Sequence, residues 1–332
     1  MQRFVNDPDR IVDDMLQGYA KAHKDMIHIC DTNDHVIVKN QMKQGKVGIV
    51  SGGGSGHEPC FFGYVGTHML DAAAAGEIFS SPPATAFLEA FKEADTGAGV
   101  ACLFGNYAGD NMNVKMAVQM AKMQGIKVKY VTATDDLASA PKENKEKRHG
   151  IAGSLFMWKI GCAKAELGGT LNEVIQAAQE AVDETRSICV GLTACSIPAV
   201  GHSNFTIEEG TMELGIGHHG EPGIHVEPIA KADEIADRLC ALVEEDLSLQ
   251  SGEEVAVIVS GLGGTPLMEQ YVLYHEVESY LSEKGIHVYK AFVGDYVTSL
   301  EMSGAALTIM RVKEHMKKLL DLDVDTPEFK MK

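Results

Sequence analysis

The sequence predicts an α/β protein: two α/β domains in which helices pack on mostly parallel or mixed sheets. Short apolar runs alternate with stretches of helical periodicity along most of the chain, and this alternation is typical of βαβ units. Glycine-rich segments follow several of the apolar runs directly. The chain has 332 residues, about twice the roughly 150 residues of an average domain, which favours two domains.

The N-terminal half alternates helix-like and strand-like segments. Its first segment has apolar residues at the spacing of one helix face. The predicted strands run into glycine or polar turn residues, and ligands of parallel sheets collect at such strand ends. The elements expected here are helices over 11–22, 84–94 and 113–124 and strands over 46–50, 100–104 and 127–131.

The C-terminal half shows the same alternation, interrupted by a segment over 195–228 that is rich in Gly, Pro and His and has little periodicity. The chain has no clear repeat or linker. We expect an N-terminal α/β domain over 1–186, which carries the glycine-rich turn and Asp110, and a C-terminal α/β domain over 187–332, which carries the His219 loop. The elements expected in this half are helices over 172–186, 230–245 and 267–284 and strands over 187–192, 254–259 and 307–312.

The charge, the hydropathy and the cysteine content of the chain argue against a nucleic-acid-binding, membrane or secreted protein. The chain carries 47 acidic and 29 basic residues, a formal net charge of −18, and such a surface repels nucleic acids and anionic lipids. No apolar run is long enough to span a membrane, and the N-terminal residues lack the apolar stretch of a secretory signal. The seven cysteines include no C-x-x-C pair, which is typical of reduced, buried thiols in a cytoplasmic protein.

The most informative segment is the run 51–59, in which four glycines directly follow a predicted strand and His57 comes next. Glycines let the backbone approach a ligand closely and direct several N–H groups at it. The run lacks the Lys-Ser/Thr of a Walker A loop and is no clean dinucleotide fingerprint. A tight structural turn between strand and helix explains the glycines equally well, but His57 favours proton transfer near neutral pH.

Two further segments carry candidate catalytic side chains. His218 and His219 lie in a loop bracketed by five Gly or Pro residues; the pair has neither the H-E-x-x-H pattern nor the i, i+4 spacing of a metal site, so metal binding is not expected. Asp110 follows the strand that ends near Gly105. It is either an acid, base or hydroxyl acceptor or the cap of the next helix. The charged run 142–148 is expected to be exposed loop surface.

Taken together, these segments resemble the dihydroxyacetone-binding (K) subunit of dihydroxyacetone kinases, in the same order from near residue 1 to about residue 326. The resemblance implies two α/β domains and a homodimer. Several positions depart from the usual family pattern: among them, Gly105 stands where a lysine is common, Ala108 where a threonine or serine is, His149 where an arginine is, and His218 where an isoleucine is. The matching segments are 48–59, 76–82, 106–110, 217–223, 264–267 and 293–302.

The resemblance also implies the roles of the site residues. In that family the histidine before Gly-Glu-Pro-Gly attacks the ketone and holds it as a hemiaminal, and the matching residue is His219. His57 and Asp110 match the acid–base pair that acts on the hydroxyls, with His57 as the proton acceptor. Contacts to the substrate are implied for Gly54, Ser55, Gly56, His57, Ser81, Gly105, Asp110 and His219.

The partners, too, come from the resemblance. It implies a K subunit that binds no cofactor and no metal itself and works with a separate L subunit carrying ATP or ADP with Mg²⁺. In many bacteria a phosphotransferase-system M protein recharges that nucleotide. Dihydroxyacetone is the expected substrate, and a four-carbon ketose such as erythrulose is the alternative. The alternative function is a non-catalytic, ketone-binding coactivator of a transcriptional regulator; a phosphate- or sugar-binding module is a more distant one.

Overall fold

The computed structural model describes residues 3–203 and 205–332 and divides into two compact units. The first unit contains Met1–Thr132, Met157–Glu180 and Lys318–Lys332, and the second contains Ala133–Phe156 and Ala181–Lys317. Each unit is built around its own six-stranded sheet. The boundary predicted between residues 186 and 187 falls inside the first strand of the second sheet.

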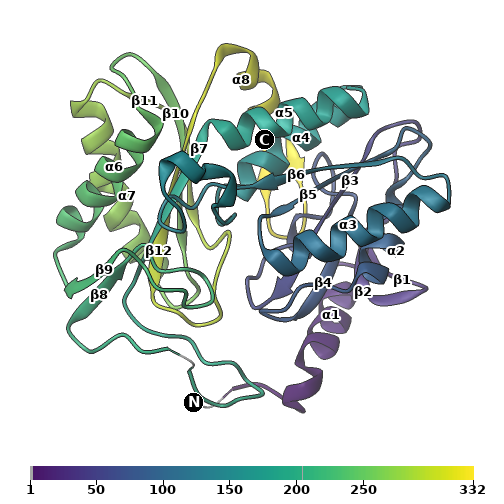
Figure 1. Ribbon diagram of the computed structural model, residues 1–332, viewed down its shortest axis with the longest axis horizontal. Coiled ribbons are helices and arrows are strands. Elements are labelled where there is room, and N and C mark those ends of the chain that lie inside the picture. Colours follow the sequence, from purple (N-terminus) through teal and green to yellow (C-terminus); the bar gives the residue numbers. More distant parts are fainter. Residues whose placement is uncertain (1–2, 204) are drawn as a thin grey trace. The chain divides into compact units, whose positions relative to one another are not determined.

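The first unit is an α/β unit with a mixed sheet in the order β1-β2-β4-β3-β5-β6 (Figure 1). The central strands β4, β3 and β5 run parallel to one another, whereas β2 pairs antiparallel with both β1 and β4. The strands are β1 Ile27–Cys30, β2 Asn33–Lys39, β3 Gly48–Ser55, β4 Ala72–Ile78, β5 Val100–Gly105 and β6 Val128–Ala133.

The helices α2 and α3 pack against each other, and α2 also packs on β2, β3 and β4 (Figure 1). The core beneath them contains Phe87, Phe91 and Phe104 and many alanines, all nearly inaccessible to solvent. The alanines of β4 are small enough for α2 to lie close to the sheet. The helices of this part of the chain are α1 Ile11–Ala22, α2 Ala84–Ala94, α3 Ala108–Met123, α4 Ser154–Glu166 and α5 Leu171–Asp183.

The glycine-rich run is strand rather than turn, which corrects the expectation that the strand ends at residue 50. β3 continues through Gly52, Gly53 and Gly54 to Ser55. A Cβ atom on Gly52 would lie 2.6 Å from the carbonyl oxygen of Ala74, and one on Gly53 would overlap the ring of Phe61. Close packing inside the unit therefore explains these glycines, and the turn that leads to His57 begins only at the end of the run.

The second unit is also α/β, but its sheet is mainly antiparallel, in the order β11-β10-β12-β7-β8-β9. β10 and β11 pair in parallel, whereas the pairs β10–β12, β12–β7, β7–β8 and β8–β9 are antiparallel. The segment expected to be irregular, 195–228, contains the short strands β8 and β9. The elements are β7 Thr185–Gly191, β8 Thr211–Leu214, β9 His225–Pro228, α6 Ala232–Leu247, β10 Glu254–Gly261, α7 Leu267–Glu283, β11 His287–Gly294 and β12 Gly304–Arg311.

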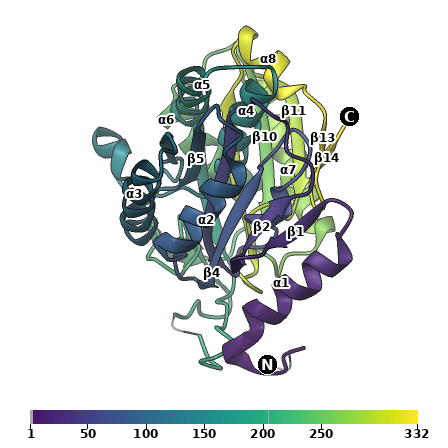
Figure 2. The same ribbon diagram turned by 90° about the vertical axis from the view of Figure 1, so that its right-hand side faces the viewer.

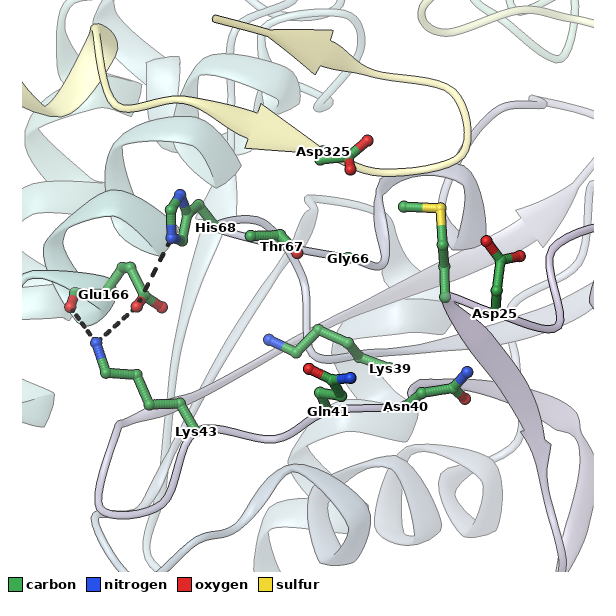
Figure 3. Close-up of a pocket in the computed structure, with 11 residues that line it drawn as sticks. Asp25, Lys39, Asn40, Gln41, Lys43, Gly66, Thr67, His68, Glu166 and Asp325 are labelled. Atoms are coloured by element: carbon green, nitrogen blue, oxygen red, sulfur yellow. Dashed lines mark hydrogen bonds and ion pairs between the residues drawn. The ribbon is translucent and has the colours of Figure 1, made fainter.

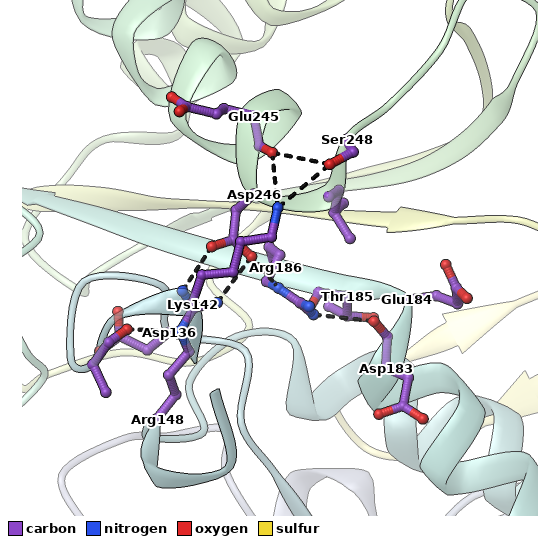
Figure 4. A network of polar contacts seen from close by, with 12 residues as sticks. Asp136, Lys142, Arg148, Asp183, Glu184, Thr185, Arg186, Glu245, Asp246 and Ser248 are labelled. Carbon is purple, nitrogen blue, oxygen red and sulfur yellow. Dashed lines mark hydrogen bonds and ion pairs between the residues drawn. The ribbon is translucent and has the colours of Figure 1, made fainter. Parts of the chain in front are cut away.

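One residue of the charged run 142–148 is buried, contrary to the expectation of loop surface. Arg148 is 1% exposed and donates two hydrogen bonds to the carboxylate of Asp246, at 2.9 and 2.6 Å. Arg186 donates to the same carboxylate at 2.5 Å, and Figure 4 shows the three side chains together. A buried guanidinium is stable only with such a bidentate partner, so this pair fastens the loop to α6.

The expectation of buried, reduced cysteines is met. The seven cysteines are all buried, and all are free thiols. Among the described residues, no helix has both the length and the apolar character that crossing a membrane requires. The last segments are α8 Glu314–Leu320 and the two-stranded sheet of β13 Val324–Asp325 and β14 Lys330–Met331.

Candidate active site

Most of the predicted site residues of the first unit lie at or just after the ends of three neighbouring strands, β3, β4 and β5. Because β4, β3 and β5 are adjacent and parallel, their carboxyl ends lie at one edge of the sheet, where α/β proteins bind ligands. His57 comes two residues after β3 ends at Ser55, and β5 ends at Gly105. Ser81 follows the end of β4 at Ile78.

Close contacts join the turns that follow these strands. The ring of His57 stacks on Phe79, with 5.0 Å between ring centroids and an angle of 26° between planes. A Cβ atom on Gly109 would lie 2.6 Å from Ser81 Oγ, so Ser81 lies directly against the first turn of α3. The Asn113 side chain donates to the carbonyl of Pro82 at 2.8 Å. The turn at 79–82 is thus in contact with both the His57 segment and the Asp110 helix.

Asp110 lies in the first turn of α3, because the helix begins at Ala108, five residues earlier than predicted. The N-cap residue is Tyr107, so Asp110 is not the capping residue that the structural alternative required. It is 7% exposed, as is His57. The positive end of the helix dipole stabilises a carboxylate at this position, which suits an acceptor for a substrate hydroxyl.

The end of the glycine run is held by hydrogen bonds within the protein. Ser55 Oγ donates to the carbonyl of Gly76 at 2.7 Å, and the N–H of Gly56 donates to the Glu58 carboxylate at 3.0 Å. The pKa of Glu58 is raised, because the effect of burial exceeds the opposite effect of the hydrogen bonds that its carboxylate accepts from backbone N–H groups. The contacts fix the backbone from which His57 projects.

His219 lies in a tight turn of the second unit, between β8 and β9. The N–H of Gly220 donates to the Gly217 carbonyl at 3.1 Å, and Gly217 N–H donates to the Glu221 carbonyl at 2.9 Å. Gly220 has a φ of +81°, a conformation that favours glycine. A side chain on Gly217 would overlap the Glu221 carboxylate. The glycines therefore let Glu221 fold back over His219.

Glu221 orients the imidazole of His219 with two contacts. One carboxylate oxygen lies 2.8 Å from His219 Nδ1, and the other accepts the His219 backbone N–H at 2.9 Å. Burial would raise the pKa of Glu221, but the hydrogen bonds and charge of His219 outweigh it and hold the pKa at about 2. A carboxylate at this pKa stays ionised and accepts a hydrogen bond from Nδ1–H, which in the neutral ring leaves the lone pair on Nε2.

Glu221 was not among the predicted site residues. Its signal in the sequence is an acid two residues after the histidine, separated from it by a glycine. That spacing has meaning only once the turn is known, because an extended backbone would direct the two side chains apart.

The neighbouring His218 is buried, whereas His219 is partly exposed to solvent. It is 2% exposed, whereas the His219 side chain is 26% exposed. Its backbone carbonyl accepts a hydrogen bond from Ser299 Oγ. Burial, together with the nearby charge of His219, lowers the pKa of His218 from 6.5 to about 4. The structure therefore separates the two histidines into one interior residue and one at the surface of the loop.

This burial predicts a loss of stability in mild acid. Between pH 6.5 and 4 the unfolded chain protonates His218 and the folded chain does not, so unfolding is favoured as the pH falls through this window. The shift corresponds to a free energy on the order of 3 kcal/mol at about 1.4 kcal/mol per pKa unit. In urea unfolding at pH 7 and pH 4.5, His218→Gln should lose less stability between the two pH values than the wild type.

The matched control is His225→Gln, because the His225 side chain is 50% exposed. This variant should keep the acid sensitivity of the wild type. An equal loss of stability in the wild type and in His218→Gln would show that His218 is not the titrating group.

A polar pocket of about 340 Å³ in the first unit contains none of the predicted site residues (Figure 3). In it, the Glu166 carboxylate lies 2.6 Å from Lys43 Nζ and 3.9 Å from His68 Nε2. Lys39 is largely buried and pairs with Asp71 at 2.5 Å. Lys39, Lys43, His68 and Glu166 of this pocket thus have partners of opposite charge within the protein. The candidate site residues of the first unit remain those at the edge formed by β3, β4 and β5.

Comparison with known proteins gives consistent matches over nearly the full chain. The Dak1 domain family matches residues 17–328. The dihydroxyacetone-binding subunit DhaK of a PTS-dependent dihydroxyacetone kinase of Listeria innocua is 43% identical over the whole of both chains. The L-erythrulose kinase of Pectobacterium atrosepticum is 36% identical over 99% of this chain and 56% of its own length.

A regulatory relative and a solved structure match as well. The DhaKLM operon coactivator DhaQ of Lactococcus lactis is 34% identical over 98% of this chain and 99% of its own length. The crystal structure of the dihydroxyacetone kinase of C. freundii has a TM-score of 0.91 at 29% identity, covering 99% of this chain and 60% of that one. These matches share the α/β fold described above.

Proposed function

Because this chain belongs to the Dak1 family of dihydroxyacetone-binding kinase subunits, we propose that it captures a short-chain ketose covalently on His219 for phosphorylation of a terminal hydroxyl. The observation that carries the proposal is the 2.8 Å contact between Glu221 and His219 Nδ1. It selects the tautomer in which Nε2 holds the lone pair that a nucleophile needs.

The capture step is an addition to the ketone carbonyl. His219 Nε2 donates its lone pair to the carbonyl carbon, and the π electrons of the C=O bond move to the oxygen. A water molecule gives the oxygen a proton, and the hydroxide that remains takes up the Nδ1 proton by way of the Glu221 carboxylate, so that charge and protons balance. Glycerol has no carbonyl and cannot react. Covalent capture thus provides selectivity that the few contacts of a three-carbon ligand cannot.

Proton transfer from the substrate hydroxyl is assigned to His57 and Asp110. A neutral imidazole is a suitable base near pH 7, and His57 is held against Phe79 with little exposure. Asp110, at the start of α3, orients the same hydroxyl by accepting its hydrogen bond. Backbone and hydroxyl groups of Gly54, Ser55, Gly56, Ser81 and Gly105 complete the proposed substrate contacts.

The phosphoryl donor is assigned to a separate L subunit, which carries ATP or ADP with Mg²⁺ and is recharged in some systems by a phosphotransferase M protein. Support comes from the Listeria relative, which is named as one subunit of a PTS-dependent kinase and aligns over its full length.

We also propose that two copies of the chain form a homodimer.

Turnover with a ketose panel tests this function. The chain is mixed with an L subunit, Mg²⁺ and ATP, or with the phosphotransferase relay, and offered dihydroxyacetone and both erythrulose enantiomers. We expect phosphorylation of dihydroxyacetone; faster turnover of erythrulose would identify a four-carbon ketose as the substrate, in line with the 36% identity to an erythrulose kinase.

The second candidate is a ketone-binding coactivator, favoured by the 34% identity to DhaQ. Both functions need the captured ketone, so binding alone does not separate them. Intact capture without turnover of any ketose by either phosphoryl source would contradict the kinase function and support the coactivator.

A further inference from the structure

Two of the segments that carry the family resemblance, 264–267 and 293–302, are not used by the proposed function. They lie at or just after the carboxyl ends of β10 and β11, which pair in parallel, and α7 packs on both strands (Figure 2). β10 ends at Gly261 and β11 at Gly294. Because the carboxyl ends of parallel strands meet at the same edge of a sheet, the turns that follow these two strands are neighbours.

The two turns are fastened to each other through their backbones. The N–H of Ser299 donates to the Leu262 carbonyl at 2.8 Å, and Gly263 forms a parallel bridge with Met302. Gly263 has a φ of +106°, and a Cβ atom there would overlap the carbonyl oxygen of Leu300. Glycine at this position therefore permits the close approach, and the approach fixes the backbone of the turn that carries Ser299.

The side chain of Ser299 points to the turn that carries His219. Ser299 is fully buried, and its hydroxyl donates a hydrogen bond to the backbone carbonyl of His218. The Sγ atom of Cys195 lies 3.6 Å from the same hydroxyl oxygen. A serine hydroxyl has one proton, and the carbonyl of His218 accepts it, so Cys195 is the donor in the second contact. The two contacts hold the hydroxyl of Ser299 in one orientation.

The peptide group between His218 and His219 is held at both of its polar ends. Its carbonyl accepts the hydrogen bond from Ser299, and its N–H donates to one carboxylate oxygen of Glu221 at 2.9 Å. The other oxygen of that carboxylate lies 2.8 Å from His219 Nδ1. A rotation of this peptide plane would withdraw the N–H from Glu221 and turn the imidazole away from the same carboxylate. The hydroxyl of Ser299 therefore acts on the imidazole through the peptide group and Glu221.

We propose that Ser299 is a positioning residue for ketose capture, because its hydroxyl fixes the His218–His219 peptide group and so keeps Glu221 on His219 Nδ1. This inference rests on the proposed function and adds to it the group that holds the backbone of the nucleophile. It gives segment 293–302 a role in capture. It also explains why a buried histidine precedes the partly exposed one, since the His218 carbonyl reaches Ser299 only from the interior of the unit.

The test is a double-mutant cycle on the dissociation constant of the dihydroxyacetone adduct, measured with the full chain from the adduct fraction at increasing ketose concentration. Ser299→Ala should raise this constant about 10-fold, which corresponds to the loss of one hydrogen bond. If Ser299 acts through Glu221, the double variant with Glu221→Gln should bind the ketose as weakly as Glu221→Gln alone, to within about twofold. A general loss of folded structure would instead multiply the two effects.

The matched control is Thr308→Val, which removes a buried hydroxyl from β12 of the same unit. The Oγ1 atom of Thr308 lies 2.6 Å from Ser187 Oγ, on the neighbouring strand β7. This variant should capture dihydroxyacetone as well as the wild type does. If Ser299→Ala does not fold, Ser299→Cys replaces it in the cycle, because a thiol is a weaker donor than a hydroxyl, and it should weaken capture in the same non-additive way.

Three outcomes would overturn the role of Ser299. They are unchanged capture in the folded Ser299 variant, effects of the Ser299 and Glu221 substitutions that multiply, and an equal loss of capture in Thr308→Val. Failure of the proposed function is distinguishable from these, because the wild-type chain would then form no adduct at any concentration of dihydroxyacetone.

Discussion

His219→Ala should abolish covalent capture of dihydroxyacetone. The alanine variant has no nitrogen at this position that can add to the carbonyl, and the small ketose has too few contacts to bind measurably without the covalent bond. Intact-protein mass spectrometry under non-denaturing conditions should show the ketose increment on the wild type and none on the variant. Phosphorylation should fall to background in the presence of the L subunit.

Two controls keep this result specific to the imidazole. His225→Ala removes a half-exposed histidine from β9 of the same unit and should retain the full adduct. Glu221→Gln keeps the nucleophile but loses a charged hydrogen bond worth about 1.5–3 kcal/mol, and it should weaken capture about 10- to 100-fold. An adduct that persists in His219→Ala would show that another group is the nucleophile.

Asp110→Asn and His57→Asn should lower turnover strongly while leaving capture in place. General acid–base groups contribute about 10²- to 10⁴-fold to rate, and neither substitution touches the atom that attacks the ketone. The measurement compares the rate of phosphoryl transfer at saturating L subunit with the fraction of chain carrying the adduct. His57→Asn should also remove the basic group from the pH profile of the maximal rate.

The control for these two variants is Asp34→Asn, on the exposed part of β2, which should leave both quantities unchanged. Equal loss of capture in the His57, Asp110 and His219 variants would contradict the division of roles. In that case the first unit would be needed to bind the ketose rather than to move its proton.

Regular helices were the most predictable part of this fold. Helix α1 over Ile11–Ala22 and helix α2 over Ala84–Ala94 have the predicted bounds, because in each an apolar stripe of helical period faces the core. Strand β4 was not predicted, since its run of four alanines has little β propensity. It is a strand because it pairs with both β2 and β3, and its side chains are small because α2 packs on it; both are tertiary requirements.

Candidate residues could be predicted from the sequence where the type of residue itself indicates chemistry. They could not be predicted where a role depends on the backbone conformation of a turn. The predicted strand ends made His57 and Asp110 candidates, and the structure brings the turns that carry them to one edge of a sheet. The role of Glu221 follows only from the backbone at Gly217 and Gly220. Likewise, Arg148 lies in a charged run that is otherwise solvent-facing, and only the position of Asp246 on α6 explains its burial.

In the proposed function, the ring nitrogen Nε2 of His219 forms a reversible bond to the carbonyl carbon of a short-chain ketose. The most direct test is ¹³C NMR of the full chain with dihydroxyacetone labelled at C2. We expect the bound C2 resonance to leave the carbonyl region for that of a tetrahedral carbon bonded to nitrogen and oxygen, and we expect no such signal with His219→Ala. A bound ketose whose C2 stays in the carbonyl region would contradict this proposal.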